Sequence, residues 1–169
     1  MPSFKTTAMP SQQQVEMEKD ENGFNILTLE YIKELCEANG QYTTPVLNDT
    51  LYLHFKGFSK IQNLDAYTNL KSIWLEGNGI SQISGLENLT KLKVIFLQQN
   101  QIHRIENLNH LKNLVTINLS QNYIKKIEGL VGLNNLENLD LHGNIIPNTE
   151  SCEELLLLPK LANLDLKDN

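Results

Sequence analysis

The sequence predicts an α/β solenoid, a curved stack of short parallel strands on a concave side with tighter turns on a convex side. Three observations predict this fold class. Asparagines recur every 22 residues, each closes a segment of pattern Leu-x-x-Leu-x-Leu with occasional Ile, and each is followed two residues later by Ile; these asparagines are Asn78, Asn100, Asn122 and Asn144. A fixed period of this length is typical of proteins built from stacked repeats.

The first half of each repeat is a short strand. Positions 1, 4 and 6 of the pattern point inward, and positions 3, 5 and 7 point outward onto the concave face, as strand periodicity requires. The asparagine closes the turn, and we expect its side chain to bond backbone groups of neighbouring coils, so that stacked asparagines form a ladder. A repeat of this kind is a leucine-rich repeat.

The returning half of each repeat has apolar residues every three positions, for example Ile102, Ile105, Leu108 and Leu111. This spacing predicts 3₁₀ or short helical turns on the convex side and not a second strand. We expect these side chains to form the core together with the strand leucines.

The pattern continues in both directions with departures. Upstream, residues 48–64 form a degenerate first coil, with Lys56 at the asparagine position and Asn48 at the first leucine position. Downstream, residues 161–169 begin a sixth copy after a longer spacing. Because solenoids normally cover their last coil with a polar cap, we expect residues 48–169 to hold about six repeats, the last one truncated, in the front part of a longer protein.

The chain before the repeats divides into a tail and a cap. Residues 1–24 are polar and lack an apolar period, which predicts a disordered tail. Residues 25–47 are predicted to form an N-terminal helical cap, because Thr28 can begin a helix that ends at Gly40. The apolar stripe of this helix should cover the open edge of the first coil.

Composition and motifs exclude several functions. The chain has 14 basic and 20 acidic residues and a net charge of −6, which disfavours nucleic-acid binding because phosphate neutralisation needs clustered Lys and Arg. No apolar run approaches the roughly 18 residues of a membrane span. The two cysteines, Cys36 and Cys152, are far apart and fit free thiols in a reducing cytosol.

Catalytic and metal-binding patterns are not found in the sequence. The histidines fall at different repeat positions and lack metal-ligand spacing; they are His54, His103, His110 and His142. Phosphate-binding and nucleophile-elbow motifs are missing as well. We therefore predict a protein that is not an enzyme and needs no cofactor or metal.

The candidate binding site is the outward-facing column at repeat position 5. Its first three members are aromatic and its last three are polar: Tyr52, Trp74, Phe96, Asn118, Asp140 and Asp165. Glu76 and Gln98 border this column from position 7. Stacked aromatics can simply stabilise a sheet, by roughly 0.2–1 kcal/mol per pair. We favour a protein-binding role because contiguous exposed Trp, Tyr and Phe side chains are typical of interface hot spots.

The 22-residue frame resembles an intracellular class of leucine-rich repeat proteins. This class includes a regulator of protein phosphatase 1, a light chain of outer-arm dynein and ciliary assembly proteins. Within it, the chain closely resembles the dynein axonemal assembly factor 1 family, on residues 31–36, 44–58, 70–75 and 96–98. The second of these segments is the most specific, and the likeness covers about residues 28–169.

This resemblance implies a non-enzymatic interaction scaffold of the cytoplasm and the cilium or axoneme, required to assemble axonemal dynein arms. The implied partners are axonemal dynein subunits, chaperones or other dynein assembly factors. Two alternatives stay open. A structural subunit of the axoneme would remain on the microtubule doublets after salt extraction, and a regulatory subunit of protein phosphatase 1 would copurify with the phosphatase catalytic subunit.

Overall fold

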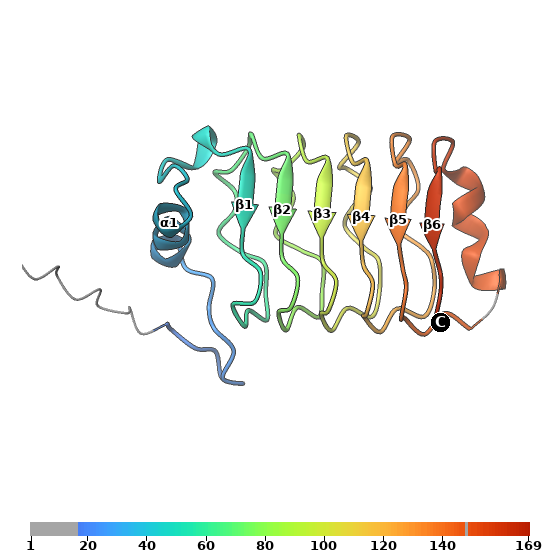
Figure 1. The fold of residues 1–169 in the computed structure, drawn as a ribbon, viewed down its shortest axis with the longest axis horizontal. Coiled ribbons are helices and arrows are strands. Elements are labelled where there is room, and N and C mark those ends of the chain that lie inside the picture. Colours follow the sequence, from blue (N-terminus) through green and yellow to red (C-terminus); the bar gives the residue numbers. More distant parts are fainter. Residues whose placement is uncertain (1–16, 148) are drawn as a thin grey trace, which may run out of the picture.

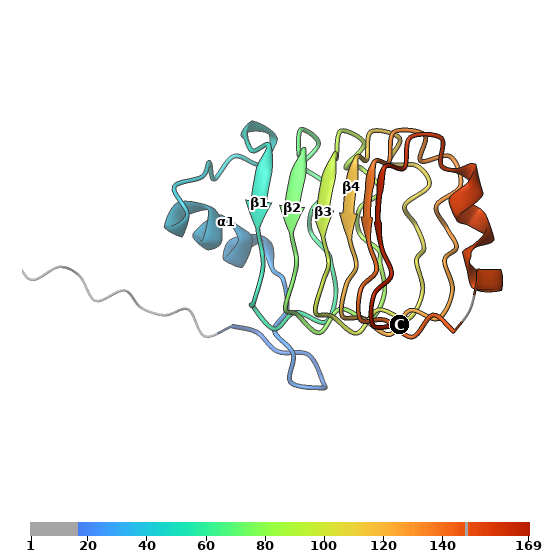
Figure 2. The same cartoon turned by 45° about the vertical axis from the view of Figure 1, so that its right-hand side comes forward.

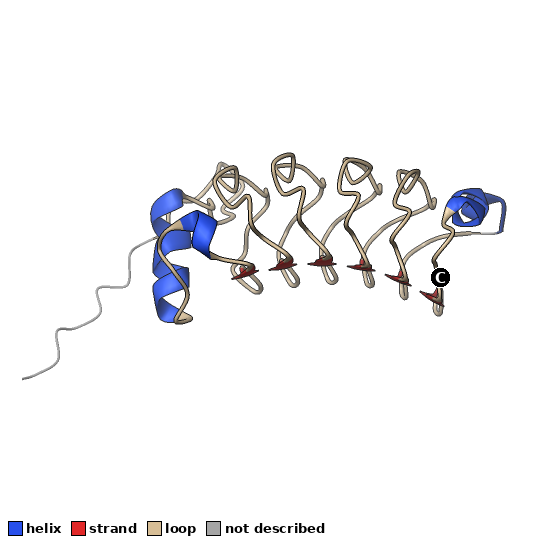
Figure 3. Ribbon diagram, turned by 90° about the horizontal axis from the view of Figure 1, so that it is seen from above, coloured by secondary structure: helices blue, strands red, loops and turns tan. Residues whose placement is uncertain are grey.

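The computed structural model describes residues 17–147 and 149–169. Within these residues the chain forms one parallel sheet of six short strands that follow each other in sequence order: β1 Thr50–Tyr52, β2 Ser72–Trp74, β3 Val94–Phe96, β4 Thr116–Asn118, β5 Asn138–Asp140 and β6 Asn163–Asp165. We number the coils 1 to 6 after their strands. The strands line the concave side of an arc, and loops form its convex side (Figures 1 and 3). The predicted α/β leucine-rich repeat solenoid is confirmed.

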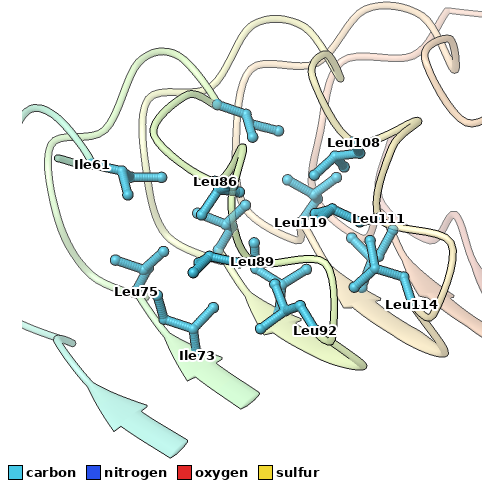
Figure 4. Close-up of a cluster of buried hydrophobic side chains, with 14 of the residues drawn as sticks. Ile61, Ile73, Leu75, Leu86, Leu89, Leu92, Leu108, Leu111, Leu114 and Leu119 are labelled. Carbon is cyan, nitrogen blue, oxygen red and sulfur yellow. The ribbon is translucent and has the colours of Figure 1, made fainter. Parts of the chain in front are cut away.

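Register between the strands places equivalent repeat positions side by side. Each strand pairs with the next in parallel, so that Trp74 lies between Tyr52 and Phe96. The inward positions are buried, and Leu70, Ile73 and Leu75 have no exposed surface. Apolar side chains of the convex loops pack onto them in one continuous core (Figure 4).

The asparagine ladder is present as predicted. Asn100 donates from Nδ2 to the carbonyl oxygens of Leu97 in its own coil and Leu75 in the preceding coil, both at 3.0 Å, and its Oδ1 accepts from the N–H of Ile80 at 3.1 Å. The same bonds recur at Asn122 and Asn144. The ladder therefore satisfies backbone groups that would otherwise be buried without partners.

The returning halves form consecutive hydrogen-bonded turns. Leu89 N–H donates to the Leu86 carbonyl at 3.0 Å, and Leu92 N–H donates to the Leu89 carbonyl at 2.9 Å. A left-handed residue precedes this turn, Gly85 with φ +69°, and limits its length. A regular 3₁₀ helix, η2 (Thr149–Leu157), lies in the longer insert before β6. The apolar spacing thus predicts the hydrogen-bond spacing correctly, although most of these turns are too short to continue as helices.

Helix α1 (Leu29–Ala38) covers the open side of coil 1 (Figures 1 and 2). Its first turn is capped by Thr28, whose Oγ1 accepts from the N–H of Tyr31 at 3.2 Å, and Gly40 follows its end with φ +66°. Its buried face consists of Ile32, Leu35 and Cys36. Among the residues described, neither this helix nor any other has the length and apolar character needed to span a bilayer.

Residues 17–24 fold against coil 1 and do not form a free tail. Asp20 accepts at Oδ1 from the N–H of Phe24 at 2.9 Å and at Oδ2 from Ser59 Oγ at 2.7 Å. The Ser59 bond, as the largest cause, lowers the pKa of the partly exposed Asp20 carboxyl. The prediction of disorder through residue 24 is therefore wrong for residues 17–24, because the Asp20 carboxylate closes a local turn with Phe24 and bonds to Ser59 on coil 1. Residues 1–16 lie outside the described residues.

Coil 1 compensates for its two departures from the repeat pattern. Asn48, at the first leucine position, is 4% exposed; its Oδ1 accepts from the N–H of Tyr42 at 3.0 Å and its Nδ2 donates to the Tyr42 carbonyl at 2.7 Å. Lys56, at the ladder position, receives a hydrogen bond at its carbonyl from Asn25 Nδ2 at 2.6 Å. The segment before the repeats therefore supplies hydrogen bonds to backbone groups at the edge that lacks a ladder asparagine.

Candidate protein-binding site on the concave face

The aromatic residues predicted at position 5 lie in contact on the concave wall. The ring centroids of Tyr52 and Trp74 are 5.9 Å apart, and those of Trp74 and Phe96 are 4.2 Å apart. All three side chains are partly exposed, whereas the strand residues that alternate with them and point into the core, such as Ile73, are buried. In-register pairing of β1, β2 and β3 produces this contact, because it places one aromatic side chain above the next.

Two further rings extend the patch, and sequence reasoning did not include them in the site. His54 lies 6.4 Å from the Trp74 ring and 5.7 Å from the Phe55 ring. Phe55 is 62% exposed and has φ +52°, a conformation that is rare for a bulky residue. We call these five residues the aromatic cluster: Tyr52, His54, Phe55, Trp74 and Phe96. The sequence does mark Phe55 as unusual, because it occupies repeat position 8, which holds Gly, Gln or Asp in the other coils.

Gly77 makes room for the Phe55 ring. A Cβ atom built on Gly77 would lie 2.1 Å from two carbons of this ring, far inside van der Waals contact. The ring therefore rests on the bare backbone of the next coil. This glycine determines where the outermost aromatic of the cluster lies.

The polar members of the column share a different geometry. Asn118, Asp140 and Asp165 each accept at Oδ1 from the backbone N–H two residues later, at 2.9, 3.0 and 2.9 Å. These bonds close the ends of β4, β5 and β6. These local hydrogen bonds thus explain why position 5 is polar in coils 4 to 6, whether or not a partner binds there.

A shallow hollow of about 420 Å³ brings the two halves of the column together. It lies on the concave face of coils 3 to 6, and its lining includes four of the predicted site residues: Phe96, Asn118, Asp140 and Asp165. Within the described residues, no three His, Cys, Asp or Glu side chains are placed to hold a metal ion. The hollow therefore offers amide, carboxylate and aromatic groups to an elongated ligand.

The two position-7 residues of the predicted site are less exposed than expected. Glu76 is 8% exposed, and Gln98 is partly exposed. Buried polar atoms of three neighbouring coils have no hydrogen-bond partner within the part of the chain that the structure describes: His54 Nδ1, Glu76 Oε2 and Gln98 Oε1. Glu76 was expected to border the aromatics as a surface group, but the structure buries most of its surface.

The fold and this wall define a leucine-rich repeat protein. A family described as "Leucine Rich repeats (2 copies)" matches residues 68–110 and 90–132. A solved chain of the Drosophila melanogaster SNF/U2A′ complex is 30% identical, with a TM-score of 0.67 and 83% of each chain covered. Internalin C2 of Listeria monocytogenes is 29% identical, with a TM-score of 0.59, covering 68% of this chain and 51% of that one. The chain belongs to the leucine-rich repeat proteins.

Within its repeats the chain is homologous to dynein axonemal assembly factor 1. The mouse protein of that name is 43% identical over 41% of this chain and 13% of the relative. The Peromyscus polionotus protein is 55% identical over 29% of this chain and 8% of the relative. The Drosophila melanogaster homologue is 50% identical over 34% of this chain and 4% of the relative. The matches thus span a small part of these longer relatives.

Proposed function

We propose that this chain is a non-enzymatic scaffold that binds protein partners through its concave face during the assembly of axonemal dynein arms, in the cytoplasm and the cilium. The observation that carries the proposal is the partly exposed contact of Trp74 and Phe96, 4.2 Å between centroids, at the centre of the aromatic cluster. The names of the homologous proteins supply the cellular process.

The magnitudes favour a binding role for these rings over a purely structural one. Cross-strand aromatic pairs contribute roughly 0.2–1 kcal/mol to a sheet. A Trp in a desolvated interface commonly costs 2 kcal/mol or more of binding when it is truncated to Ala, roughly thirty-fold in affinity. If these rings bind a partner, the loss of Trp74 should therefore weaken binding far more than it lowers the stability of the fold.

The proposed partners are axonemal dynein subunits, chaperones or other dynein assembly factors. The net charge of −6 makes nucleic acid an unfavourable ligand. A solved solenoid with 30% identity is part of a complex named for two components, which supports partner binding by this type of surface.

The test is a pull-down and a dynein-arm rescue in ciliating cells with Trp74→Ala combined with Phe96→Ala. The matched control is His103→Ala with Tyr123→Ala, which removes a stacked ring pair, 5.4 Å between centroids, outside the concave wall. We expect the concave double variant to lose partner capture by at least about thirty-fold and to fail in rescue, with a melting temperature close to that of the wild type. The control variant should behave as wild type.

Normal rescue by a folded concave double variant would remove this face from the mechanism. Unfolding of that variant would show that the rings belong to the core. Fractionation of the same cells tests the cellular role, because an assembly factor should be recovered mainly from the cell body, whereas a resident axonemal subunit should stay with the doublets.

A further inference from the structure

The concave wall of coils 1 to 3 contains hydrogen-bond acceptors that lack donors. Glu76 Oε2 and Gln98 Oε1 can only accept, and His54 Nδ1 either accepts or donates depending on its tautomer. All three atoms are buried without a partner among the described residues. Because leaving a buried polar atom unpaired is unfavourable, such a row indicates a place that is completed by another molecule.

Charge at this place is negative and uncompensated. Four ion pairs are formed among the described residues, and Glu76 takes part in none of them. Lys71, in the same coil, pairs instead with Asp49 at 3.3 Å. The group that would complete this row is therefore a donor that also carries positive charge.

The surrounding rings favour the same kind of ligand. Trp74 precedes Glu76 by two residues on the same face, and its ring contacts the rings of His54 and Phe96. A guanidinium or ammonium group over the face of a Trp is attracted by the ring quadrupole. Arginine fits best, since its planar fork presents several N–H groups to two acceptors while it stacks on a ring.

Access to the carboxylate is available despite its burial. Glu76 keeps 8% of its surface exposed, and only its Oε2 is among the fully buried unpaired atoms. Rotation about the last side-chain bond exchanges the two oxygens, because this torsion is broad and nearly two-fold. A cation that arrives from the concave side can therefore pair with the carboxylate without a backbone change.

We propose that coils 1 to 3 bind a basic side chain, preferably arginine, in an extended segment of the protein partner. Its cation pairs with Glu76 and Gln98 and lies against Trp74. This inference rests on the proposed function of the concave face and adds the chemistry of the partner to it. The aromatic cluster supplies contact area, and Glu76 supplies the selection for positive charge.

Trp74 allows a direct measurement, because it is the only tryptophan in the chain. The probes are three capped heptapeptides with one alternating Ala-Ser background and a central arginine, lysine or norleucine. We expect saturable changes in Trp74 fluorescence with the arginine and lysine peptides, and at least ten-fold weaker binding of the norleucine peptide. Glu76→Gln should remove this preference, whereas Glu137→Gln, the same change at an exposed carboxylate outside the predicted site, should retain it.

Gln98→Glu keeps the test decisive if Glu76→Gln fails to fold. This variant adds a second carboxylate beside the first and should bind the arginine peptide more tightly than wild type does. Three results would overturn the inference: no saturable binding of the arginine peptide, equal binding of the norleucine peptide, or an unchanged preference in folded Glu76→Gln.

Failure of this inference is distinguishable from failure of the proposed function. If folded Glu76→Gln captures the cellular partner normally while the Trp74 and Phe96 double variant loses it, the concave face binds the partner but does not select a basic side chain. If Glu76→Gln loses the peptide preference while the double variant still rescues dynein arms, the basic site exists and the proposed function is wrong.

Discussion

At the scale of single residues, repeat position 8 explains much of what differs between coils. This position is left-handed in every coil, and the residues that occupy it are Phe55, Gly77, Gln99, Gln121, Gly143 and Asp168. Left-handed backbone costs an L-residue roughly 1–2 kcal/mol relative to Gly. A Phe in this conformation, 62% exposed and with its ring against that of His54, is a strained residue of the kind that persists at binding surfaces.

Two glycines with the same backbone conformation allow the cost of backbone strain to be measured separately from the effect of displacing the Phe55 ring. Gly77→Ala introduces a Cβ at φ +63° that would lie 2.1 Å from the ring, whereas at Gly143, φ +65°, the nearest atom is the flexible Gln121 Cγ at 3.4 Å. We expect Gly143→Ala to cost roughly 1–2 kcal/mol of unfolding free energy. Gly77→Ala should cost more and should also change Trp74 fluorescence and partner capture.

Urea unfolding, Trp74 emission and the pull-down check this pair of variants. Equal unfolding free energies with unchanged emission would show that the Phe55 ring does not rest on Gly77. The concave site would then be independent of this glycine.

At the scale of elements, the sequence predicts strands and helix well and predicts the edge of the solenoid poorly. Each strand is specified by its own alternation, and α1 by Thr28 at its start and Gly40 after its end. The folding of residues 17–24 depends on partners such as Ser59, 39 positions away from Asp20 in the chain, and a local pattern contains no such information.

The candidate site shows the same limit. Outward positions and aromatic contact follow from the repeat register. The burial of Glu76 and the local hydrogen bond of Asp140 depend instead on the sizes and rotamers of neighbouring side chains, which a pattern of apolar and polar letters does not contain.

Packing of α1 on coil 1 predicts unequal reactivity of the two thiols. Cys36 is fully buried with its Sγ 4.0 Å from Tyr67 Oη, and burial raises the pKa of the Cys36 thiol and of the Tyr67 hydroxyl. Cys152 is partly exposed. Because the thiolate is the nucleophile, native Cys36 should react with iodoacetamide much more slowly than Cys152.

Peptide mass spectrometry at several pH values measures the two rates, and denatured protein supplies the control, in which both thiols should react alike. Raised pKa values mean that the folded state favours the protonated forms. Their stabilising contribution is therefore present below the ordinary thiol pKa and decreases as the pH rises above it. Equal native rates would contradict the packing of α1.

At the scale of the whole molecule, stability depends on coupling between neighbouring coils. A solenoid gains its stability from repeats and from the interfaces between them, since each coil contacts only its neighbours. The asparagine ladder connects these coils through the core, and its last rung makes the same bonds as the inner rung Asn122 with more access to water. Asn122 is 4% exposed, whereas Asn169 is exposed.

This difference yields a prediction about the ladder. Asn122 Nδ2 donates to the carbonyls of Leu97 and Leu119 at 3.0 Å, and its Oδ1 accepts from Ile102 N–H at 3.0 Å. Asn169 makes the equivalent bonds at 2.9, 2.9 and 3.1 Å. Asn122→Ala leaves buried backbone groups unpaired, at about 1–3 kcal/mol each before relaxation, and should lower the unfolding free energy by at least about 2 kcal/mol.

Asn169→Ala removes the same set of bonds where water can replace them, so its cost should be well below that of Asn122→Ala. Urea unfolding of both variants gives the comparison. Amide hydrogen exchange shows where Asn122→Ala loses stability, because protection should fall most in coils 3 to 5, on both sides of the missing rung. Equal losses for the two variants would mean that burial does not determine the strength of the ladder, and that its inner rungs do not couple the coils more tightly than the outermost one.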